Sequence, residues 1–308
     1  MRRLALPSED ELVDRLITLW VPHEDIDTAI SLLPRLKESS ELSSLLEGRA
    51  AALIDDIGVL HDHSESQMYL PALGDEFDSL GRYFYLFVFL LVLPYAEEYF
   101  EKHGVPPEIR RRTLADLGGN MAENRLWFGE GGIQDPKWLS LHFRGMLYSL
   151  GRLQFERSRI GPSLLWKIQG LADAVEEREA VLFIHIPRFA GPLTSPACSL
   201  SLDRASNFFT RHAFGDDYRI AICSSWLLDV QLAKYLPASS NILSFQRRFG
   251  NTLTSLGTDD AAVRFVFGPS GVTPEIWAGM STLERAIIDH RSAGGEWRRG
   301  AGWIRLSD

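Results

Sequence analysis

The spacing of hydrophobic residues changes near Gly151, and this change constrains the fold more than any other feature of the chain. In the first half, apolar residues recur every three or four positions, as Leu12, Leu16 and Leu19 do, which is the spacing of amphipathic helices. From Leu153 onward, apolar and polar residues alternate, which is the spacing of half-buried strands. We therefore predict an α+β protein in which an all-helical domain is followed by an α/β domain.

The second half alternates strand-like and helix-like segments. Apolar runs such as VLFIHI, which ends before Pro187, are typical of buried strands. Amphipathic segments with helical spacing separate these runs. The pattern predicts strands at 153–157, 181–186, 218–223, 263–267 and 302–306, and helices at 203–212, 228–236 and 282–292.

Helix signals occur throughout the first half. Ser8 and Glu11 have the spacing of a capping box, and Asp25 is placed to cap a helix that ends before Pro34. The segment LGGN at 117–120 is typical of a helix C-terminus. Further helices are predicted at 41–60, 76–101 and 107–117.

Charge also divides the chain. Residues 1–130 hold 12 Lys and Arg against 24 Asp and Glu, whereas the remaining residues hold 20 against 17. Asp135 followed by Pro136 marks a helix start, because Asp is a good cap and Pro fits the first helical position. We place the domain boundary there, with domains at 1–134 and 135–308. The formal net charge of −9 argues against a nucleic acid partner.

Nothing in the sequence points to a membrane or to secretion. The most apolar run, YFYLFVFLLVLPY at 83–95, is short of the ~20 residues that span a bilayer, so it predicts a buried core helix. The N-terminal segment turns acidic at Glu9 and lacks the apolar stretch of a signal peptide. Two cysteines, Cys198 and Cys223, are too few for a disulfide framework. We expect a cytoplasmic protein without a membrane partner.

Several histidines were considered as metal ligands. His61 and His63, in the segment HDHSE, face the same way only on a strand, and this segment follows a predicted helix, so a solvated loop is the better interpretation. His142 lies on the apolar stripe of the helix that begins at Asp135, which indicates a hydrogen-bonded core histidine. The sequence contains neither HExxH nor a CxxC pair, and no metal is predicted.

His185 and Glu156 are the candidate catalytic residues. His185 lies near the end of the strand predicted at 181–186, ahead of the loop PRFAGPL, and an imidazole there is placed to accept a proton near neutral pH. Glu156 lies on the preceding predicted strand and either pairs with His185 or acts as the base itself. The alternatives are a buried structural histidine and a surface carboxylate near three arginines, Arg152, Arg157 and Arg159.

The segment 218–237 is a candidate anion site. A buried strand ends at Cys223 and leads through Ser224 and Ser225 into a predicted helix, whose first N–H groups and the two hydroxyls favour an anion. Cys223 itself is interpreted as either a small buried residue or a nucleophile.

Two arginines lie just downstream of this segment, in SFQRRF. Arg247 and Arg248 either complete the anion site or form a solvated helix face. The sequence has no G-x-S-x-G elbow, no Walker A motif and no GxGxxG, so no motif supports a serine hydrolase, nucleotide hydrolysis or dinucleotide binding.

Six separated blocks carry a resemblance to a known family, and they occur in the family's order: LGGNMAENR, WLSLHFRGMLYSLGRLQFER, FIHIPRFAGPL, SSWLLDVQLAKYLP, NILSFQRRF and TLERAIIDHRSAGGEW. The chain resembles the two-domain bacterial acyltransferases, which join a helical N-acyltransferase N-terminal domain to a GNAT-like C-terminal domain. The resemblance implies an all-helical domain followed by a mixed sheet. It also implies acyl transfer from a thioester, either acyl-CoA or acyl carrier protein, to an amine or hydroxyl of a small molecule or peptide.

The resemblance also suggests roles for the candidate residues. Glu156 or His185 would be the base, and backbone N–H groups near Cys223–Ser225 would polarise the thioester carbonyl. Ordinary GNAT enzymes bind pyrophosphate with an R/Q-x-x-G-x-G/A loop, but the corresponding place in this sequence reads SSWLLD, which has no glycine. Three residues are candidates for the acyl or pantetheine channel, with core packing as the alternative: Trp226, Leu227 and Phe249.

Two functions of other classes remain as alternatives. One is a ligand-binding module that has a GNAT-like fold without catalysis, which the missing glycine loop favours. The other is a thioester hydrolase that uses Cys223 as nucleophile and His185 as base.

Overall fold

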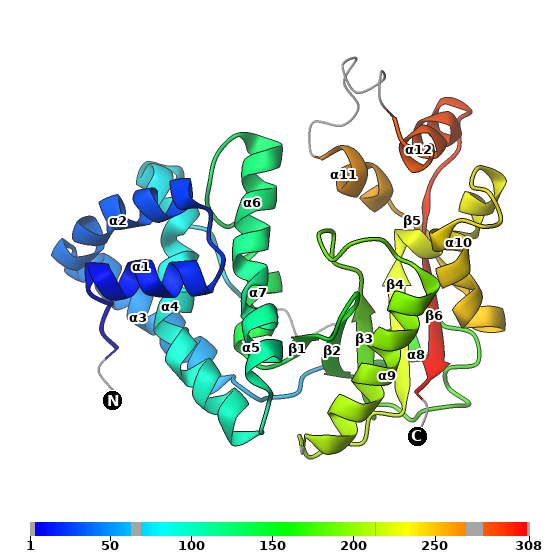
Figure 1. The fold of residues 1–308 in the computed structure, drawn as a ribbon, viewed down its shortest axis with the longest axis horizontal. Coiled ribbons are helices and arrows are strands. Elements are labelled where there is room, and N and C mark those ends of the chain that lie inside the picture. Colours follow the sequence, from blue (N-terminus) through cyan, green and yellow to red (C-terminus); the bar gives the residue numbers. More distant parts are fainter. Residues whose placement is uncertain (1–3, 63–68, 213, 269–279, 307–308) are drawn as a thin grey trace. The chain divides into compact units, whose positions relative to one another are not determined.

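The computed structural model describes residues 4–62, 69–212, 214–268 and 280–306, and the chain divides into two compact units, Met1–Ser149 and Leu150–Asp308 (Figure 1). In the described part of the first unit the regular structure is helical apart from one short strand at its end. The second unit contains the remaining strands, with helices between them. The predicted α+β class, with an all-helical part first, is confirmed.

The described residues of the first unit form seven α-helices. Ser8 caps the first of them, and its capping box with Glu11 is present as predicted. A short 3-10 turn, η1 (Asp75–Phe77), precedes the fourth helix. The helices are α1 (Glu9–Thr18), α2 (His23–Glu38), α3 (Ser40–Asp55), α4 (Asp78–Lys102), α5 (Pro107–Leu114), α6 (Asp116–Phe128) and α7 (Pro136–Phe143).

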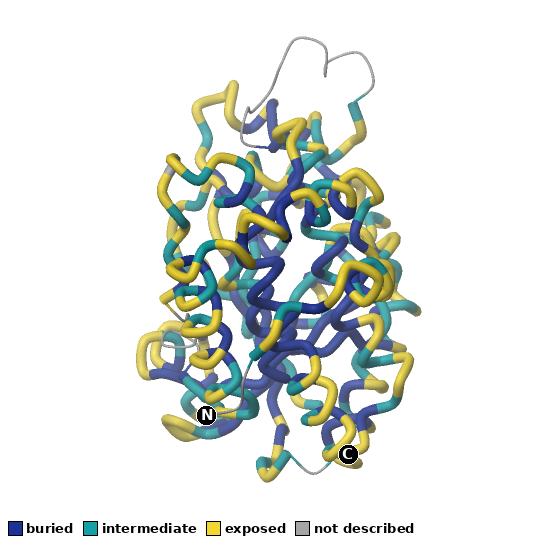
Figure 2. The backbone as a smooth tube through the Cα atoms, turned by 90° about the vertical axis from the view of Figure 1, so that its left-hand side faces the viewer, coloured by how far each residue is buried: buried dark blue, intermediate teal, exposed yellow. Residues whose placement is uncertain are grey.

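Helix α4 is the core of the first unit. Every residue from Tyr83 to Leu93 is buried (Figure 2), and the ring of Phe89 stacks on Phe143 of α7 with centroids 4.7 Å apart. Its length and composition alone would allow it to cross a membrane, but 72% of its apolar window is buried within the protein. This burial is what we predicted for a core helix, since a lipid-facing helix would present that surface outward.

Two helix boundaries differ from the prediction. Asp25 does not cap α2, which begins two residues earlier and runs through Pro34. Its carboxylate is fully buried, where it accepts hydrogen bonds from the Tyr83 hydroxyl and from the Arg125 guanidinium at 2.7 Å. A tertiary partner has therefore replaced the local cap.

The glycines of LGGN lie inside α6 instead of ending a helix. Gly118 approaches the turn after α1 so closely that its N–H donates to Leu19 O, and a Cβ there would lie 2.1 Å from Trp20 O. Gly119, by contrast, has open space beside it. The first glycine is thus required by close backbone packing, which local sequence does not reveal.

Helix α7 begins as predicted, with Asp135 Oδ1 accepting a hydrogen bond from Trp138 N at 2.9 Å. It ends at Phe143 and is followed by the short strand β1 (Leu147–Ser149), so the helical stripe does not continue to Leu150. Because α7 packs on α4 through its apolar face, it lies in the first compact unit, although the predicted boundary at 134/135 assigned it to the second domain.

The sheet is mixed, in the strand order β1-β2-β3-β4-β6-β5. Strands β3 and β4 are parallel, and the pairs β2–β3, β4–β6 and β5–β6 are antiparallel. The second unit provides β2 (Gln154–Arg159), β3 (Ala180–His185), β4 (Ile220–Ser225), β5 (Thr254–Thr258) and β6 (Arg298–Arg305).

The two faces of this sheet are covered differently (Figure 1). Helix α9 (Ser195–Arg211) crosses one face, and its Ser201 hydroxyl accepts hydrogen bonds from the backbone N–H groups of Arg152 and Leu153 at the start of β2. The other face packs against α8 (Pro162–Leu165) and the turns that follow it. That second core includes Phe183, Ile222 and Ala301 together with Leu165, Ile168 and Leu171.

Three further helices lie between β4 and β6 in the sequence: α10 (Asn241–Gln246), α11 (Ala261–Phe267) and α12 (Thr282–Ser292). The segment VRFVF at 263–267, predicted as a strand, belongs to α11. Asp259 Oδ1 accepts from Ala261 N at 2.8 Å at the helix start, and Ala261, Ala262 and Phe267 are buried in a cluster with α12. Contact with α12 explains the apolar spacing better than strand alternation does.

Strand β5 was not predicted. It is a polar edge strand in which no residue is fully buried, and it contains Gly257 at φ +109°. Its pairing with β6, not its own composition, makes it a strand.

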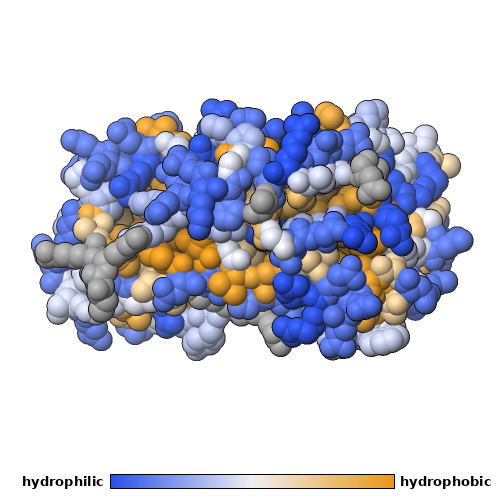
Figure 3. Space-filling view, turned by 90° about the horizontal axis from the view of Figure 1, so that it is seen from below, coloured by the Kyte–Doolittle hydropathy of each residue, from blue (hydrophilic) through white to orange (hydrophobic). Residues whose placement is uncertain are grey.

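The surface view of Figure 3 is mostly hydrophilic, with smaller hydrophobic areas between the polar residues.

Candidate functional site

Glu156 and His185 lie together on one face of the sheet. In the antiparallel register of β2 and β3, Gln154 is opposite His185 and Glu156 is opposite Phe183, so the two candidates are diagonal neighbours. Their side chains meet, with His185 Nε2 2.7 Å from Glu156 Oε2. The structure thus brings together the two residues that the sequence proposed as alternative bases.

The two partners differ in exposure. The Glu156 side chain is 2% exposed and the His185 side chain 25%. A buried carboxylate is stable only with hydrogen-bond donors, and the histidine N–H supplies one when Nε2 carries the proton. The imidazole is therefore the more accessible of the two candidates, and its Nε2 lies against the buried carboxylate.

Cys223 lies on the opposite face of the sheet. Side chains alternate along a strand, and the neighbour Ile222 pairs with Phe183 on the face of His185. The thiol is fully buried, and this burial raises its pKa to about 12. Cys223 is therefore a small core residue, and the hydrolase hypothesis lacks its nucleophile.

Strands β3 and β4 stop pairing where the candidate residues begin. The last parallel pair is Ile184 with Cys223, although β3 continues to His185 and β4 to Ser225. Beyond this pair, β3 leads into the loop 186–194 and β4 leads into a 3-10 turn. Ligands of α/β sheets commonly bind where the carboxyl ends of such strands separate.

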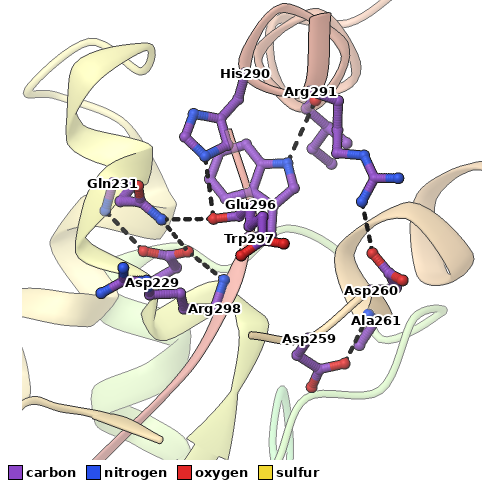
Figure 4. A network of polar contacts seen from close by, with 11 residues as sticks. Asp229, Gln231, Asp259, Asp260, Ala261, His290, Arg291, Glu296, Trp297 and Arg298 are labelled. Carbon is purple, nitrogen blue, oxygen red and sulfur yellow. Dashed lines mark hydrogen bonds and ion pairs between the residues drawn. The ribbon is translucent and has the colours of Figure 1, made fainter. Parts of the chain in front are cut away.

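The predicted helix at 228–236 is wrong. The chain forms two 3-10 turns instead, η2 (Trp226–Leu228) and η3 (Val230–Lys234). The cause is Asp229, whose carboxylate accepts from Gln231 N at 2.9 Å, Gln231 Nε2 at 3.1 Å and Arg298 N at 2.7 Å (Figure 4). The bond from Arg298 N holds Asp229 against β6, and the bond from Gln231 N makes Asp229 the cap of η3, so the helix that the sequence pattern favours is interrupted there.

The chain after Cys223 therefore lacks the helix start on which the predicted anion site depends. Ser225 Oγ accepts from Leu227 N at 3.1 Å, so this hydroxyl and this N–H satisfy each other. A three-residue 3-10 turn also has no helix dipole comparable to that of a full helix. Ser224 is half-buried at the end of β4 and keeps its place in the candidate site.

Two of the three channel candidates belong to the core. Trp226 is 9% exposed in the cluster that contains α11 and α12, and Phe249 is 2% exposed. A Cβ at Gly302 would lie 2.9 Å from Phe249 Cβ, so the ring covers β6. Leu227 is partly buried against the same cluster as Trp226.

Arg247 and Arg248 have different partners. Arg247 donates to Ala238 O at 3.1 Å and to Ser244 Oγ at 2.7 Å within its own segment. Arg248, carried by the 3-10 turn η4 (Arg247–Thr252), donates to Ser195 O at 2.6 Å, Ser195 Oγ at 2.8 Å and Ser199 Oγ at 2.9 Å. It therefore lies at the first turn of α9.

The start of α9 differs from the prediction, which placed it at residue 203. The helix starts eight positions earlier, with Thr194 as its cap and Pro196 in the first turn. Burial raises the pKa of the Cys198 thiol in this turn, while the nearby positive charges of Arg248 and Arg152 oppose the rise. The signal was present in the sequence as the Pro-Gly-containing loop between a strand and Thr194.

Two of the other histidines, His142 and His61, have structural partners. His142 is fully buried, and its Nε2 lies 3.2 Å from Asp116 Oδ2, as expected of a core histidine. His61 Nε2 lies 2.7 Å from Asp56 Oδ1, and the second oxygen of Asp56 pairs with the buried Arg144. His63 lies outside the described residues. Among the residues that the structure describes, no group of three His, Cys, Asp or Glu side chains is arranged to hold a metal ion.

A mixed sheet in which the parallel strands β3 and β4 are joined by helix α9 and separate at their carboxyl ends is the arrangement of a GNAT-like domain. Residues 147–304 match the GNAT-like C-terminal domain family, and residues 10–145 match the N-acyltransferase N-terminal domain family. The chain belongs to these two-domain acyltransferases, and it transfers an acyl group from a thioester to an acceptor.

Solved structures of acyltransferases resemble the whole chain. One, in complex with decanoyl-CoA and teicoplanin, is 32% identical with a TM-score of 0.84, and the match covers 99% of this chain and 91% of that one. A mutant in complex with octanoyl-CoA has the same identity, coverage and TM-score. A third, with decanoyl-CoA, is 33% identical with a TM-score of 0.83 and the same coverage. No curated protein matches the chain.

Proposed function

We propose that this chain transfers a medium-length acyl group from acyl-CoA to an amine of a small-molecule acceptor, with His185 as the general base and Glu156 as the residue that orients it. The observation that carries the proposal is the 2.7 Å contact between a quarter-exposed imidazole and a buried carboxylate at the end of β3. This arrangement matches the chemistry of aminolysis, in which the attacking nitrogen must lose a proton.

The reaction follows from these positions. The acceptor nitrogen attacks the thioester carbonyl carbon, and His185 takes the proton that the nitrogen releases. The negative charge that develops on the carbonyl oxygen needs a donor, and backbone N–H groups at the separating ends of β3 and β4 are suited to this role. The carbon–sulfur bond then breaks, and the thiolate leaves with the electron pair.

The first turn of α9 is the proposed site for the phosphates of the donor. Anions bind at helix N-termini because free N–H groups and the helix dipole favour negative charge. The 17-residue helix follows directly on the β3 loop, and Arg248 adds a positive charge at Ser195. Arg152 reaches the same loop, with Nη1 donating to Pro187 O at 3.1 Å. This replaces the anion site that we predicted after Cys223.

The identity of donor and acceptor is extended from the relatives. Their structures hold octanoyl-CoA, decanoyl-CoA and teicoplanin. For this chain we propose an eight- to ten-carbon acyl-CoA and a small-molecule acceptor. An acyl carrier protein, which we also considered from the sequence, presents the same thioester and is the alternative donor.

The test is a transfer assay with mass detection. The purified full chain is incubated with octanoyl-CoA or decanoyl-CoA and with teicoplanin or a panel of primary amines, and products are sought at the mass of the acceptor plus the acyl group. The same assay with an acylated carrier protein distinguishes the donors. Failure to release CoA or to form an acylated product from any of these pairs would overturn the proposal.

A further inference from the structure

We propose that Ser224 is a further catalytic residue, whose hydroxyl donates a hydrogen bond to the thioester sulfur as the thiolate leaves. This inference rests on the proposed function and adds a third group to the pair of Glu156 and His185. It assigns to Ser224 a role in the chemical step, where the sequence analysis had suggested only donor binding.

The sheet register places Ser224 beside the catalytic pair. The last β3–β4 pair is Ile184 with Cys223, so Ser224 follows at the level of His185 where the strands separate. Because side chains alternate along β4, Ser224 shares the face of Ile222 and not that of Cys223. On this face Ile222 packs with Phe183, which is two positions before His185 on β3. Ser224 and His185 thus lie on adjacent strands and on the same face.

The two consecutive serines at the end of β4 differ in the hydrogen bonds of their hydroxyl groups. Ser225, on the other face, uses its hydroxyl to accept a hydrogen bond from Leu227 N at 3.1 Å. Ser224 Oγ forms no hydrogen bond with any residue of the described ranges, and its partner across the β4–β6 pair is the small, fully buried Ala301. Its half-buried hydroxyl is therefore the one that remains available to a ligand.

The chemistry requires such a donor. When the acceptor nitrogen bonds to the carbonyl carbon, the carbon–sulfur bond breaks and its electron pair becomes the charge of the thiolate. An alkyl thiolate is basic, since a thiol such as that of cysteine has a pKa of ~8.5, so a hydrogen bond to sulfur stabilises the transition state. Ser224 keeps its proton. The proton taken up by His185 from the nitrogen is finally transferred to the thiolate, which restores the base.

The experiment compares Ser224→Ala with Ser224→Thr, which differ in whether the hydroxyl is present. With octanoyl-CoA and an acceptor that the wild type acylates, Ser224→Ala is expected to lower kcat about 10- to 100-fold, as for the loss of a hydrogen bond to a developing charge, with little change in KM. Ser224→Thr should retain most of the rate. Circular dichroism and melting temperature establish that both variants are folded.

The leaving group gives the decisive comparison. The ratio of wild-type to Ser224→Ala rates is measured with octanoyl thioesters of N-acetylcysteamine, an alkyl thiol, and of thiophenol, whose thiolate is much less basic. The ratio should be large for the first donor and close to one for the second. Equal ratios for both, or an unchanged kcat in folded Ser224→Ala, would overturn this role. A wild type that forms no acylated product while binding octanoyl-CoA would instead count against the proposed function.

Discussion

His185 Nε2 lies 2.7 Å from Glu156 Oε2, and the carboxylate is almost completely buried while the imidazole remains one quarter exposed. The pair spans two antiparallel strands, β2 and β3, so the sheet itself fixes its geometry. In many enzymes that use histidine as a base, a carboxylate forms a hydrogen bond with one ring nitrogen and leaves the other nitrogen to accept the proton. The predictions below begin with this pair.

Removing the base should slow the reaction more than removing its partner. His185→Ala is expected to lower kcat about 10²- to 10⁴-fold at neutral pH, which is the usual contribution of general base catalysis. Its deficit should shrink as pH rises and the acceptor amine loses its proton unaided. Glu156→Gln keeps a hydrogen-bond partner for the ring and should lower kcat less. Rates across pH 6–9 for variants with wild-type circular dichroism check this, and full activity of both variants would contradict it.

Arg248 should contribute more to donor affinity than its neighbour Arg247. Arg248→Gln removes a positive charge and the contacts to Ser195 and Ser199 at the start of α9, whereas Arg247 contacts Ala238 and Ser244. We expect Kd for CoA to rise about tenfold or more in Arg248→Gln, since a hydrogen bond to a charged group contributes about 1.5–3 kcal/mol. Isothermal titration of CoA into both variants measures the difference. Equal losses in the two would remove the α9 site from consideration.

The two cysteines should resist alkylation in the native protein. Both Cys198 and Cys223 are buried, and burial raises both thiol pKa values, that of Cys223 to about 12. The reactive thiolate is therefore scarce near pH 8. Iodoacetamide followed by peptide mass analysis should label them slowly in the native state and rapidly in denaturant. Fast native labelling of Cys223 with loss of activity would restore the hydrolase hypothesis.

Two adjacent glycines in α6 should respond oppositely to alanine. In Gly118→Ala, the new Cβ would lie 2.1 Å from Trp20 O, so the backbone must shift and stability should fall by about 2 kcal/mol or more. In Gly119→Ala, the Cβ meets nothing within 4 Å, and the higher helix propensity of Ala should add up to ~1 kcal/mol. Urea unfolding of both variants compares the free energies. A neutral Gly118→Ala would refute the close packing described above.

Tyr83 should ionise late on alkaline titration. Desolvation, followed by the hydrogen bond to Asp25, raises its pKa to about 12, and desolvation does the same for Tyr85. Since a free tyrosine ionises near pH 10, the unfolded chain loses these protons first, so their contribution to stability is complete below pH 10 and is lost as pH rises toward 12. Absorbance at 295 nm should show a delayed component that Tyr83→Phe reduces. Complete titration near pH 10 in folded protein would contradict this.

Local signals in the sequence were sufficient wherever neighbours along the chain make the structure. The capping box at Ser8, the cap at Asp135, the core helix at 83–93 and the buried strands β3 and β4 could be predicted, because caps and hydrophobic period depend on residues a few positions apart. The proximity of Glu156 and His185 was also open to prediction, since consecutive strands commonly pair.

The remaining features depend on residues that are distant in sequence. Asp229 divides a predicted helix because it accepts a hydrogen bond from Arg298 N, nearly seventy positions away. The segment 263–267 is helical because α12 covers it, and β5 is a strand because β6 pairs with it. Hydrophobic period alone cannot separate a short helix from a short strand, so tertiary contacts decide.

The sequence by itself determined the order of an all-helical part and an α/β part, the types of the long elements and the two residues of the candidate base, because these depend on local periodicity and on the chemistry of single side chains. Only the tertiary structure decided which of that pair is exposed, that Cys223 faces away from it, and that Arg248 lies at the start of α9. The physical reason is that these features depend on packing between segments that are far apart in the sequence. The exposure of a side chain, the sheet face on which it lies and its distant hydrogen-bond partners are set only when those segments come together.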